Sequence, residues 1–155
     1  DLVACFSVQE ETGGQGAITA GEALKPDAAI VLECTTATDT PGMPLAKVAS
    51  QFRKGPAITL ADSGTIVPET MVSFLESQAR AAEIPWQFKT PRIGGTNARL
   101  LQISGCGVPV GVIAAPCRYI HSPASILHKS DLEHTMALAL RAMKNAGELF
   151  NALED

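Results

Sequence analysis

Hydrophobic and polar positions along this 155-residue chain alternate between strand-like and helix-like patterns. Short apolar, β-prone runs predict strands at residues 2–8, 28–34, 56–60, 86–89 and 108–114. The run at 28–34 is unbroken, as is typical of a strand buried on both faces. Between the runs, amphipathic or Gly/Pro-bounded stretches predict helices at residues 17–24, 68–82, 96–103 and 130–150. Alternating strands and helices predict a layered α/β domain.

Two of these helices have a predicted apolar face. The first begins at Pro68, whose missing N–H needs no partner in a first turn. Its inner face is expected to carry Met71, Leu75, Ala79 and Ala82. The last helix has capping-box spacing between Ser130 and Glu133. Its apolar stripe is expected to comprise Leu132, Met136, Leu140, Met143, Ala146 and Phe150.

Composition limits the classes of protein to consider. Hydrophobic residues make up 46% and charged residues 18% of the chain, as in a folded globular domain. A net charge of −4 gives no basic face for nucleic acid, and no apolar run approaches the roughly 18 residues of a membrane span. The first residues lack the basic start of a secretory leader. The four cysteines form no CxxC pair, so we expect reduced, buried thiols and a cytoplasmic protein; they are Cys5, Cys34, Cys106 and Cys117.

Candidate chemistry lies where apolar strands end. Glu10 and Glu11 close the first predicted strand, Glu33 closes the second, and His121 follows the strand that begins at Val108. Ligands of open α/β sheets bind at the carboxyl ends of strands. Carboxylates and an imidazole at one rim would form a metal site, and adjacent glutamates could divide metal binding from proton transfer.

Each of these residues also has a plainer interpretation. An acidic pair after a strand is usually a solvated turn, and a single histidine such as His121 is more often a packed or surface residue than a ligand. Glu33 follows four apolar residues, and burying a carboxylate without a partner is costly, so a paired or functional role is as plausible as a structural one. We expect His128 and His134 to be structural or solvated. Asp39 and Asp62 suit turns, and Asp62-Ser63-Gly64 has turn chemistry.

Taken together, the motifs resemble one known family. Residues 8–13 read Val-Gln-Glu-Glu-Thr-Gly and precede Gly16-Ala17. This is similar to the VQEE-(V/T)-G-x-x-GA signature of glutamyl/deblocking aminopeptidases, which include proteins labelled cellulase M or endoglucanase and tetrahedral aminopeptidases. Four further stretches resemble the family in the same order, at residues 38–42 (TDTPG), 54–58 (KGPAI), 94–96 (GGT) and 118–123 (RYIHSP).

The resemblance implies a role for each candidate residue. Glu10 matches the general base, Glu11 a ligand of one metal, Glu33 the carboxylate ligand of the other, and His121 the histidine ligand. The implied cofactors are two divalent ions, zinc or cobalt, which activate a water to hydrolyse the N-terminal peptide bond of peptide substrates. The implied fold is a three-layer α/β sandwich with a mixed, mostly parallel sheet, as in zinc exopeptidases.

The chain departs from the family at several positions. Glu33 stands where the family usually has Asp, Asn97 replaces the Asp of GGTDA, and Gly14-Gln15 replaces Leu-Arg. The last two differences bear on substrate preference more than on reaction class. The family's first metal-binding histidine, its bridging aspartate and its inserted β-rich domain all lie upstream of these residues. Residues 1–155 therefore resemble the C-terminal portion of the catalytic domain, incomplete at its N-terminus and expected to be inactive alone. We expect the missing N-terminal half and copies of the same chain as partners, but neither nucleic acid nor a membrane.

Two rival functions remain open at this point. One is another two-metal amidohydrolase, such as a deacylase, on the same fold; the other is a non-catalytic module kept for assembly. Cleavage of sugars by paired carboxylates is less well supported, because that chemistry needs no histidine ligand and one Trp offers little stacking surface.

Overall fold

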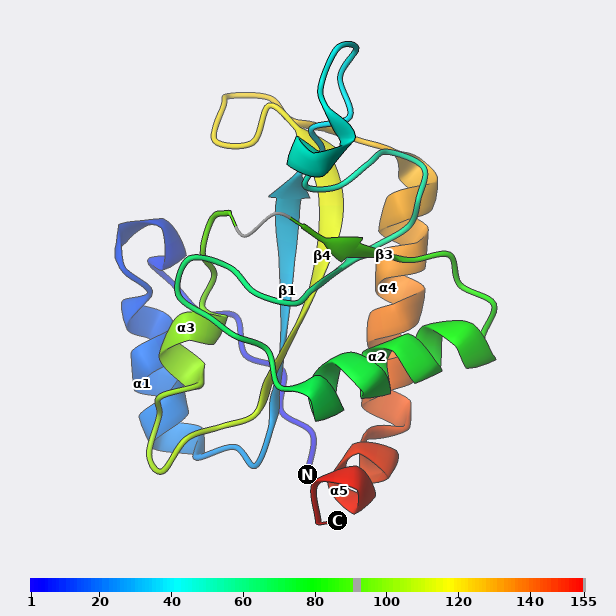
Figure 1. Cartoon of the computed structure of the whole chain (residues 1–155). Coiled ribbons are helices and arrows are strands. Elements are labelled where there is room, and N and C mark those ends of the chain that lie inside the picture. The colour runs from blue at the N-terminus through cyan, green and yellow to red at the C-terminus, as the bar shows by residue number, and fades with distance from the viewer. Residues whose placement is uncertain (91–92, 155) are drawn as a thin grey trace.

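The centre of the molecule is a mixed β-sheet, seen in a computed structural model that describes residues 1–90 and 93–154 (Figure 1). Its strand order is β1-β4-β2-β3. Strand β1 (Ala29–Thr36) runs parallel to β4 (Val110–Arg118) over its full length. Strand β2 (Ala57–Thr59) is antiparallel to β4 and parallel to β3 (Gln87–Lys89), while β5 (Ile126–Leu127) pairs with the end of β4. The predicted mixed α/β fold is confirmed.

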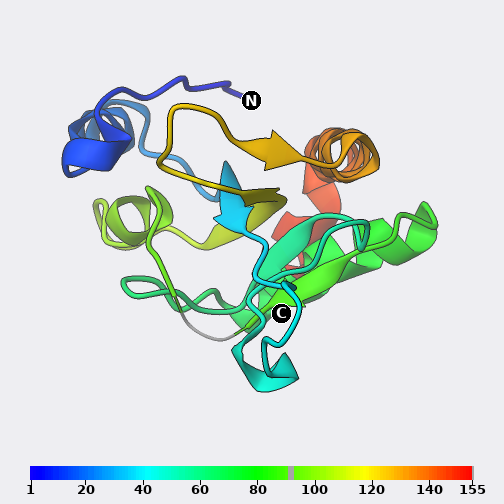
Figure 2. The same ribbon diagram turned by 90° about the horizontal axis from the view of Figure 1, so that it is seen from above.

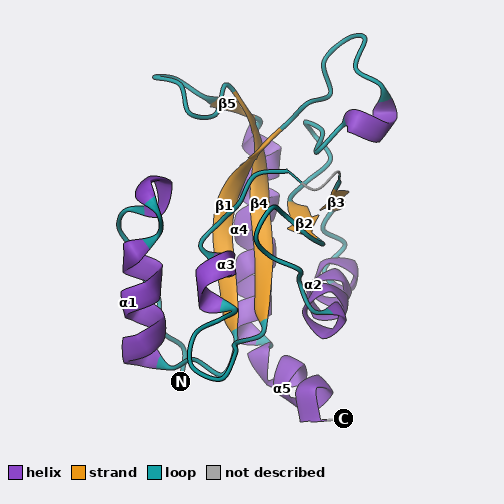
Figure 3. Cartoon of the chain, turned by 60° about the vertical axis from the view of Figure 1, so that its left-hand side comes forward, coloured by secondary structure: helices purple, strands orange, loops and turns teal. Residues whose placement is uncertain are grey.

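Helices cover both faces of the sheet (Figure 2, Figure 3). On one side, α2 (Glu69–Ala81) and α4 (Lys129–Lys144) pack against each other and against β4, and α5 (Ala146–Glu154) contacts α2. On the other side, α3 (Ala98–Leu101) lies between the sheet and α1 (Gln15–Leu24). Two 3-10 helices, η1 (Glu10–Thr12) and η2 (Leu45–Lys47), lie in the connections. None of the helices described is long and apolar enough to cross a membrane.

The core lies between β4 and the pair α2–α4. Every residue of β4 except Arg118 is buried. At Gly111 a Cβ atom would stand only 3.0 Å from Met71 Cε and 3.2 Å from Leu75 Cδ1, so the glycine lets α2 approach the strand closely. Met71, Leu75 and Ala79 are buried as predicted. Ala82 is exposed because α2 ends one residue before it.

The predicted strand at residues 2–8 is wrong. This segment is extended but belongs to no strand, because no strand in the described part of the chain pairs with it. Its apolar side chains are exposed, and Phe6 is 96% exposed. Its end is anchored by the Gly16 N–H, which donates to the Val8 carbonyl at 3.1 Å. A run of β-prone residues shows only that the side chains suit a strand. Whether a strand forms also depends on a neighbouring strand that supplies the backbone hydrogen bonds.

The predicted apolar stripe of the last helix is also wrong. Helix α4 buries Thr135, Leu138, Ala139 and Ala142, together with Asp131. The expected residues Leu132, Met136, Leu140 and Phe150 are at least 39% exposed. Helix α4 has apolar residues on two faces, and the face with Leu138 and the smaller Thr135, Ala139 and Ala142 is the buried one. Its N-cap is His128, whose Nδ1 accepts a hydrogen bond from the Ser130 N–H, rather than the predicted Ser130–Glu133 box.

Other expectations need smaller corrections. The helix after Gly94-Gly95 is short and ends at Leu101, and β1 is not buried on both faces, because Leu32 is 54% exposed. All four cysteines are free, as expected, but only Cys117 is buried. Cys5 lies in the unpaired N-terminal segment, Cys34 on the uncovered side of β1, and Cys106 in the turn before β4.

Candidate active site

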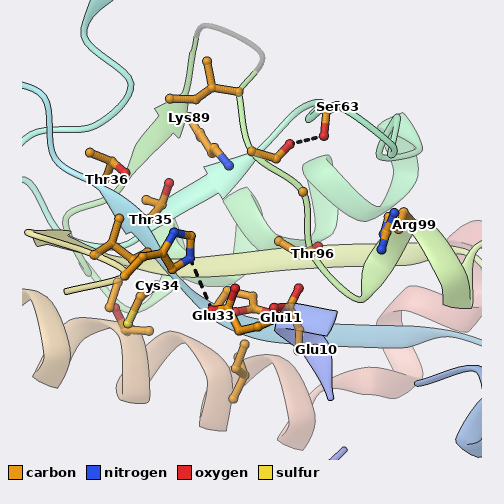
Figure 4. A pocket seen from close by; sticks show the side chains of 18 of the residues that line it. Glu10, Glu11, Glu33, Cys34, Thr35, Thr36, Ser63, Lys89, Thr96 and Arg99 are labelled. Atoms are coloured by element: carbon orange, nitrogen blue, oxygen red, sulfur yellow. Dashed lines mark hydrogen bonds and ion pairs between the residues drawn. The ribbon is translucent and has the colours of Figure 1, made fainter. Parts of the chain in front are cut away.

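Four predicted site residues line one cavity of about 930 Å³. They are Glu10, Glu11, Glu33 and His121, from three segments far apart in sequence. The walls also include Ser63, Lys89, Thr96 and Arg99 (Figure 4). The expectation that these glutamates and this histidine meet at one side of the sheet therefore agrees with the structure; their chemical roles stay predictions.

A tight turn presents Glu10 and Glu11. Gln9, which precedes them, has a left-handed backbone with φ of 61°, and Gly13 and Gly14 follow with φ of 124° and 76°. The Gly14 N–H donates to the Gln9 carbonyl at 2.7 Å and closes the turn. Glu10 is half-buried and Glu11 is exposed, so the two neighbours face different environments.

Glu33 lies within β1 rather than at its end, because the strand continues to Thr36. It is half-buried. Burial, followed by the negative charges of Glu10 and Glu11, raises the pKa of Glu33 to about 7, and the charge of Lys89 opposes this only in part. Three carboxylates thus lie close enough for Glu10 and Glu11 to repel Glu33, and a cation would offset that repulsion.

His121 lies three residues beyond β4, on an exposed loop. Its Nε2 atom is 3.2 Å from Glu11 Oε1. Both Tyr119 and His121 have left-handed backbones with φ of 61°. Such conformations are costly for residues other than glycine and cluster at functional sites. The Ser122 N–H donates to the Tyr119 carbonyl at 3.2 Å and helps to hold this loop.

The donor set fits a divalent cation in chemistry. Glu11, Glu33 and His121 offer carboxylate oxygens and an imidazole, which suit zinc or cobalt. A bound cation would also offset the electrostatic repulsion of Glu33 by Glu10 and Glu11. Within the described residues, however, no three His, Cys, Asp or Glu side chains already stand close enough together to hold an ion. These residues can contribute ligands to a metal site, but their side chains do not by themselves form a complete coordination shell in this conformation.

Lys89 is a buried, charged cavity residue that the sequence analysis missed. It closes β3, is only 5% exposed, and points into the cavity (Figure 4). Burial lowers the pKa of Lys89, and the charges of Asp62 and Glu33 counteract part of that effect. A lysine at the end of a strand-like run was the available signal, but such residues are usually solvated.

The remaining polar candidates lie outside the cavity lining. Asp62 Oδ1 accepts hydrogen bonds from the Gly64 and Thr65 amides, which confirms the predicted turn. Asp39 does more than occupy a turn, because its carboxylate accepts from the Phe52 amide and from Arg118. His128 caps α4, and His134 lies on the same helix outside the cavity lining.

Comparison with known proteins places these features in a family. Residues 1–138 match the family described as M42 glutamyl aminopeptidase. The lysyl aminopeptidase of Pyrococcus furiosus is 33% identical over 140 residues, which cover 90% of this chain and 39% of that protein. The chain thus spans about two fifths of the length of that relative.

Solved structures show the same relationship. A TET aminopeptidase from a marine sediment thaumarchaeon is 34% identical, with a TM-score of 0.83 over 87% of this chain and 38% of that one. A TET peptidase of Pyrococcus horikoshii, described as assembling into a tetrahedron or a large octahedral shell, is 26% identical with a TM-score of 0.69. That likeness covers 89% of this chain and 39% of that one.

Proposed function

This chain belongs to the M42 glutamyl aminopeptidase family, and from that premise we propose that it forms the C-terminal portion of the catalytic domain of a metal-dependent aminopeptidase. The observation that carries the proposal is the meeting of Glu10, Glu11, Glu33 and His121 around one cavity. Family membership explains why that combination would be useful, since carboxylates and an imidazole can hold metal and move protons in peptide hydrolysis.

Glu11, Glu33 and His121 would hold the metal, together with ligands from the rest of the protein. The contact between Glu11 and His121 supports placing these two at one ion. When bound, two divalent ions of zinc or cobalt would supply Lewis-acid chemistry that polarises the scissile carbonyl and activates water. The acidic side of the cavity also suits the free α-ammonium group of a peptide, which would restrict cleavage to N-terminal residues.

Glu10 would act as the general base. It is half-buried and adjacent to the proposed ligand Glu11, yet it forms no ion pair among the described residues. Its carboxylate is therefore available to take a proton from the attacking water and to pass one to the departing amine.

The proposal extends to partners and place of action. The printed names in the family include glutamyl and lysyl aminopeptidases, so membership leaves the preferred N-terminal residue open. We infer that peptides are the substrates, that the rest of the catalytic domain packs against this chain, and that the whole protein forms a homo-oligomer, as a TET relative does. Free thiols on the surface suit the reducing cytoplasm.

The test uses the full-length protein that contains this chain. A peptide with a free N-terminus and its N-acetylated form are compared, before and after chelation of metal and after zinc or cobalt is restored. We expect cleavage of the free peptide only, lost on chelation and recovered with metal. Preference for the N-acylated compound would favour a deacylase instead, and full-length protein that neither binds metal nor cleaves either compound would indicate a non-catalytic assembly module.

A further inference from the structure

The turn at η1, which carries the two adjacent glutamates, is held by a segment far away in the sequence. Before the turn, Asn97 Nδ2 donates a hydrogen bond to Ser7 Oγ at 3.0 Å, although the two residues are 90 positions apart. After the turn, Arg99 Nη2 donates to the Gly13 carbonyl at 3.4 Å. Contacts from the start of α3 therefore bracket η1 on both sides, and the placement of both glutamates depends on them.

Gly14 makes this close fit possible. It has a left-handed backbone with φ of 76°, and a Cβ atom there would stand 2.8 Å from Asn97 Oδ1 and would overlap Leu100 Cδ1. Gly14 and Asn97 are both positions at which this chain departs from the family pattern, and neither lines the cavity. The structure thus brings two of the departures into contact behind the turn, rather than among the residues that would meet a substrate.

The needs of helix α3 do not account for the side chain of Asn97. The residue is 8% exposed and stands at the N-cap of α3, yet its side chain makes no capping hydrogen bond. Its Oδ1 atom has no hydrogen-bond partner among residues 1–90 and 93–154. Burying an amide with an unpaired oxygen is costly, so a residue that served only the packing of α3 would gain by being apolar. The amide of Asn97 acts on Ser7 instead.

We propose that Asn97 is a positioning residue that holds, through Ser7, the turn that carries Glu10 and Glu11. This inference rests on the proposed aminopeptidase function. A general base must lie within hydrogen-bond reach of the proton it takes, and a misplacement of about 1 Å can lower the rate by about 100-fold. Ser7 lies three residues before Glu10, in a segment that belongs to no strand in the described part of the chain. Asn97 gives this segment a fixed point that strand pairing does not provide.

The competing role for Asn97 is to fill space between α3 and the turn. The two roles differ in what they predict. Leucine, which matches asparagine in size, would fill the same space, and a packing role would not depend on the hydroxyl of Ser7. A positioning role requires the hydrogen bond itself, so it is lost when either partner is removed.

The first measurement needs no catalytic activity. Hydrogen–deuterium exchange is followed in the full-length protein at the amides of Gly14 and Gly16, whose hydrogen bonds close the turn. Asn97→Leu and Ser7→Ala are each expected to raise the exchange rate of these amides by about 3- to 10-fold, the range for loss of one hydrogen bond. Asn151→Leu, which changes an exposed asparagine of α5, is the matched control and is expected to leave that rate unchanged.

The second measurement separates kcat from KM for an aminoacyl-p-nitroanilide. Asn97→Leu and Ser7→Ala are each expected to lower kcat by about 10- to 100-fold with little change in KM, because the substrate still binds while the base is misplaced. The double variant is expected to have a kcat no lower than the weaker single variant, since both changes remove the same contact. Ser7→Thr keeps the hydroxyl and is expected to keep a kcat close to that of the wild type.

The outcomes separate this inference from the proposed function. A wild-type kcat or unaltered amide exchange in Asn97→Leu, or additive effects in the double variant, would overturn the positioning role and leave the aminopeptidase proposal intact. A lower melting temperature of Asn97→Leu with a wild-type kcat per folded molecule would assign the residue to packing instead. Should the full-length protein cleave no such substrate, the proposed function fails, and amide exchange alone decides whether Asn97 holds the turn.

Discussion

The imidazole of His121 meets the carboxylate of Glu11, with Nε2 3.2 Å from Oε1, although one follows strand β4 and the other lies in 3-10 helix η1. The side chains are 66% and 69% exposed, so the pair contributes little to stability in water. Its importance is positional, because it places a carboxylate and an imidazole together beside the half-buried Glu33.

This geometry predicts different roles for two neighbouring glutamates. In the full-length protein, Glu10→Gln is expected to lose nearly all turnover and to keep its metal, because it removes a proton acceptor. Glu11→Gln is expected to lose metal as well, because it removes a ligand beside His121. Metal content by elemental analysis and turnover of an aminoacyl-p-nitroanilide are measured on the same samples. Equal loss of metal in both variants would contradict the division of labour.

The second prediction concerns Asp131, which is fully buried at the start of α4. Its Oδ1 accepts the Gly55 N–H at 2.9 Å, and its Oδ2 accepts the Arg53 N–H at 2.8 Å. Asp131→Asn replaces one acceptor with a donor that would face an N–H group. We expect a loss of about 1–3 kcal/mol in the free energy of unfolding of the chain, measured by urea denaturation. The exposed Asp27→Asn serves as control, and an equal effect of both changes would show that these two hydrogen bonds contribute little.

Much of the fold could be predicted from the sequence, because the residues within its central strands and helices themselves favour those structures. The runs that became β1 and β4 are apolar over most of their length, and α2 begins at Glu69, one residue after the predicted start at Pro68. Periodicity failed at α4, where two faces carry apolar residues and only tertiary packing decides which one turns inward. It failed again at residues 2–8, since strand pairing depends on a neighbour that local sequence does not specify.

The candidate site also has residues that the sequence identified and a residue that it did not. Motifs identified Glu10, Glu11, Glu33 and His121 because recurrent chemistry leaves recurrent residue patterns. Lys89 belongs to no such pattern, and a lysine after a short apolar run is normally solvated. Its burial arises in the folded chain, where the loop at Gly94 lies beside its Nζ atom and the charges of Asp62 and Glu33 act on it.

The third prediction is a pH dependence set by Asp39. Burial raises the pKa of Asp39, but hydrogen bonds from Arg118 at 2.8 Å and from the Phe52 amide at 3.1 Å, with the charge of Arg118, bring the pKa below its usual value. A lowered carboxyl pKa stabilises the fold above the unfolded value of about 4, and that stability is lost as pH falls through the folded value.

Asp39→Asn therefore provides the measurement. We expect the variant to be less stable than the wild type by about 0.5–1 kcal/mol at pH 7, a modest value because the pair is partly exposed. The difference is expected to shrink as the pH falls below about 4, where the wild-type carboxylate also becomes neutral. Urea denaturation at a series of pH values measures it, and a gap that does not change between pH 7 and pH 3 would contradict the assigned pKa shift.

The last prediction is that the 155-residue chain alone is not a competent enzyme. It would supply the base Glu10 and the ligands Glu11, Glu33 and His121, while the family resemblance places a further histidine and the bridging aspartate outside these residues. Without a shared anion, two cations at short range repel each other strongly. We therefore expect the chain to bind at most one ion, weakly, and to leave it poorly positioned for catalysis.

The open edge of β1 adds a second consequence. Among residues 1–90 and 93–154, strand β1 pairs only with β4, and nearby apolar side chains such as Leu32 and Met136 are exposed. Unpaired strand edges and apolar patches favour association, so the purified chain is expected to self-associate or to bind the remaining part of the protein. Assay of the chain with added zinc or cobalt on aminoacyl-p-nitroanilides, alongside the full-length protein, tests the prediction. Robust metal-dependent turnover by the chain alone would show that its own residues complete the site, and the proposed need for outside ligands would have to be abandoned.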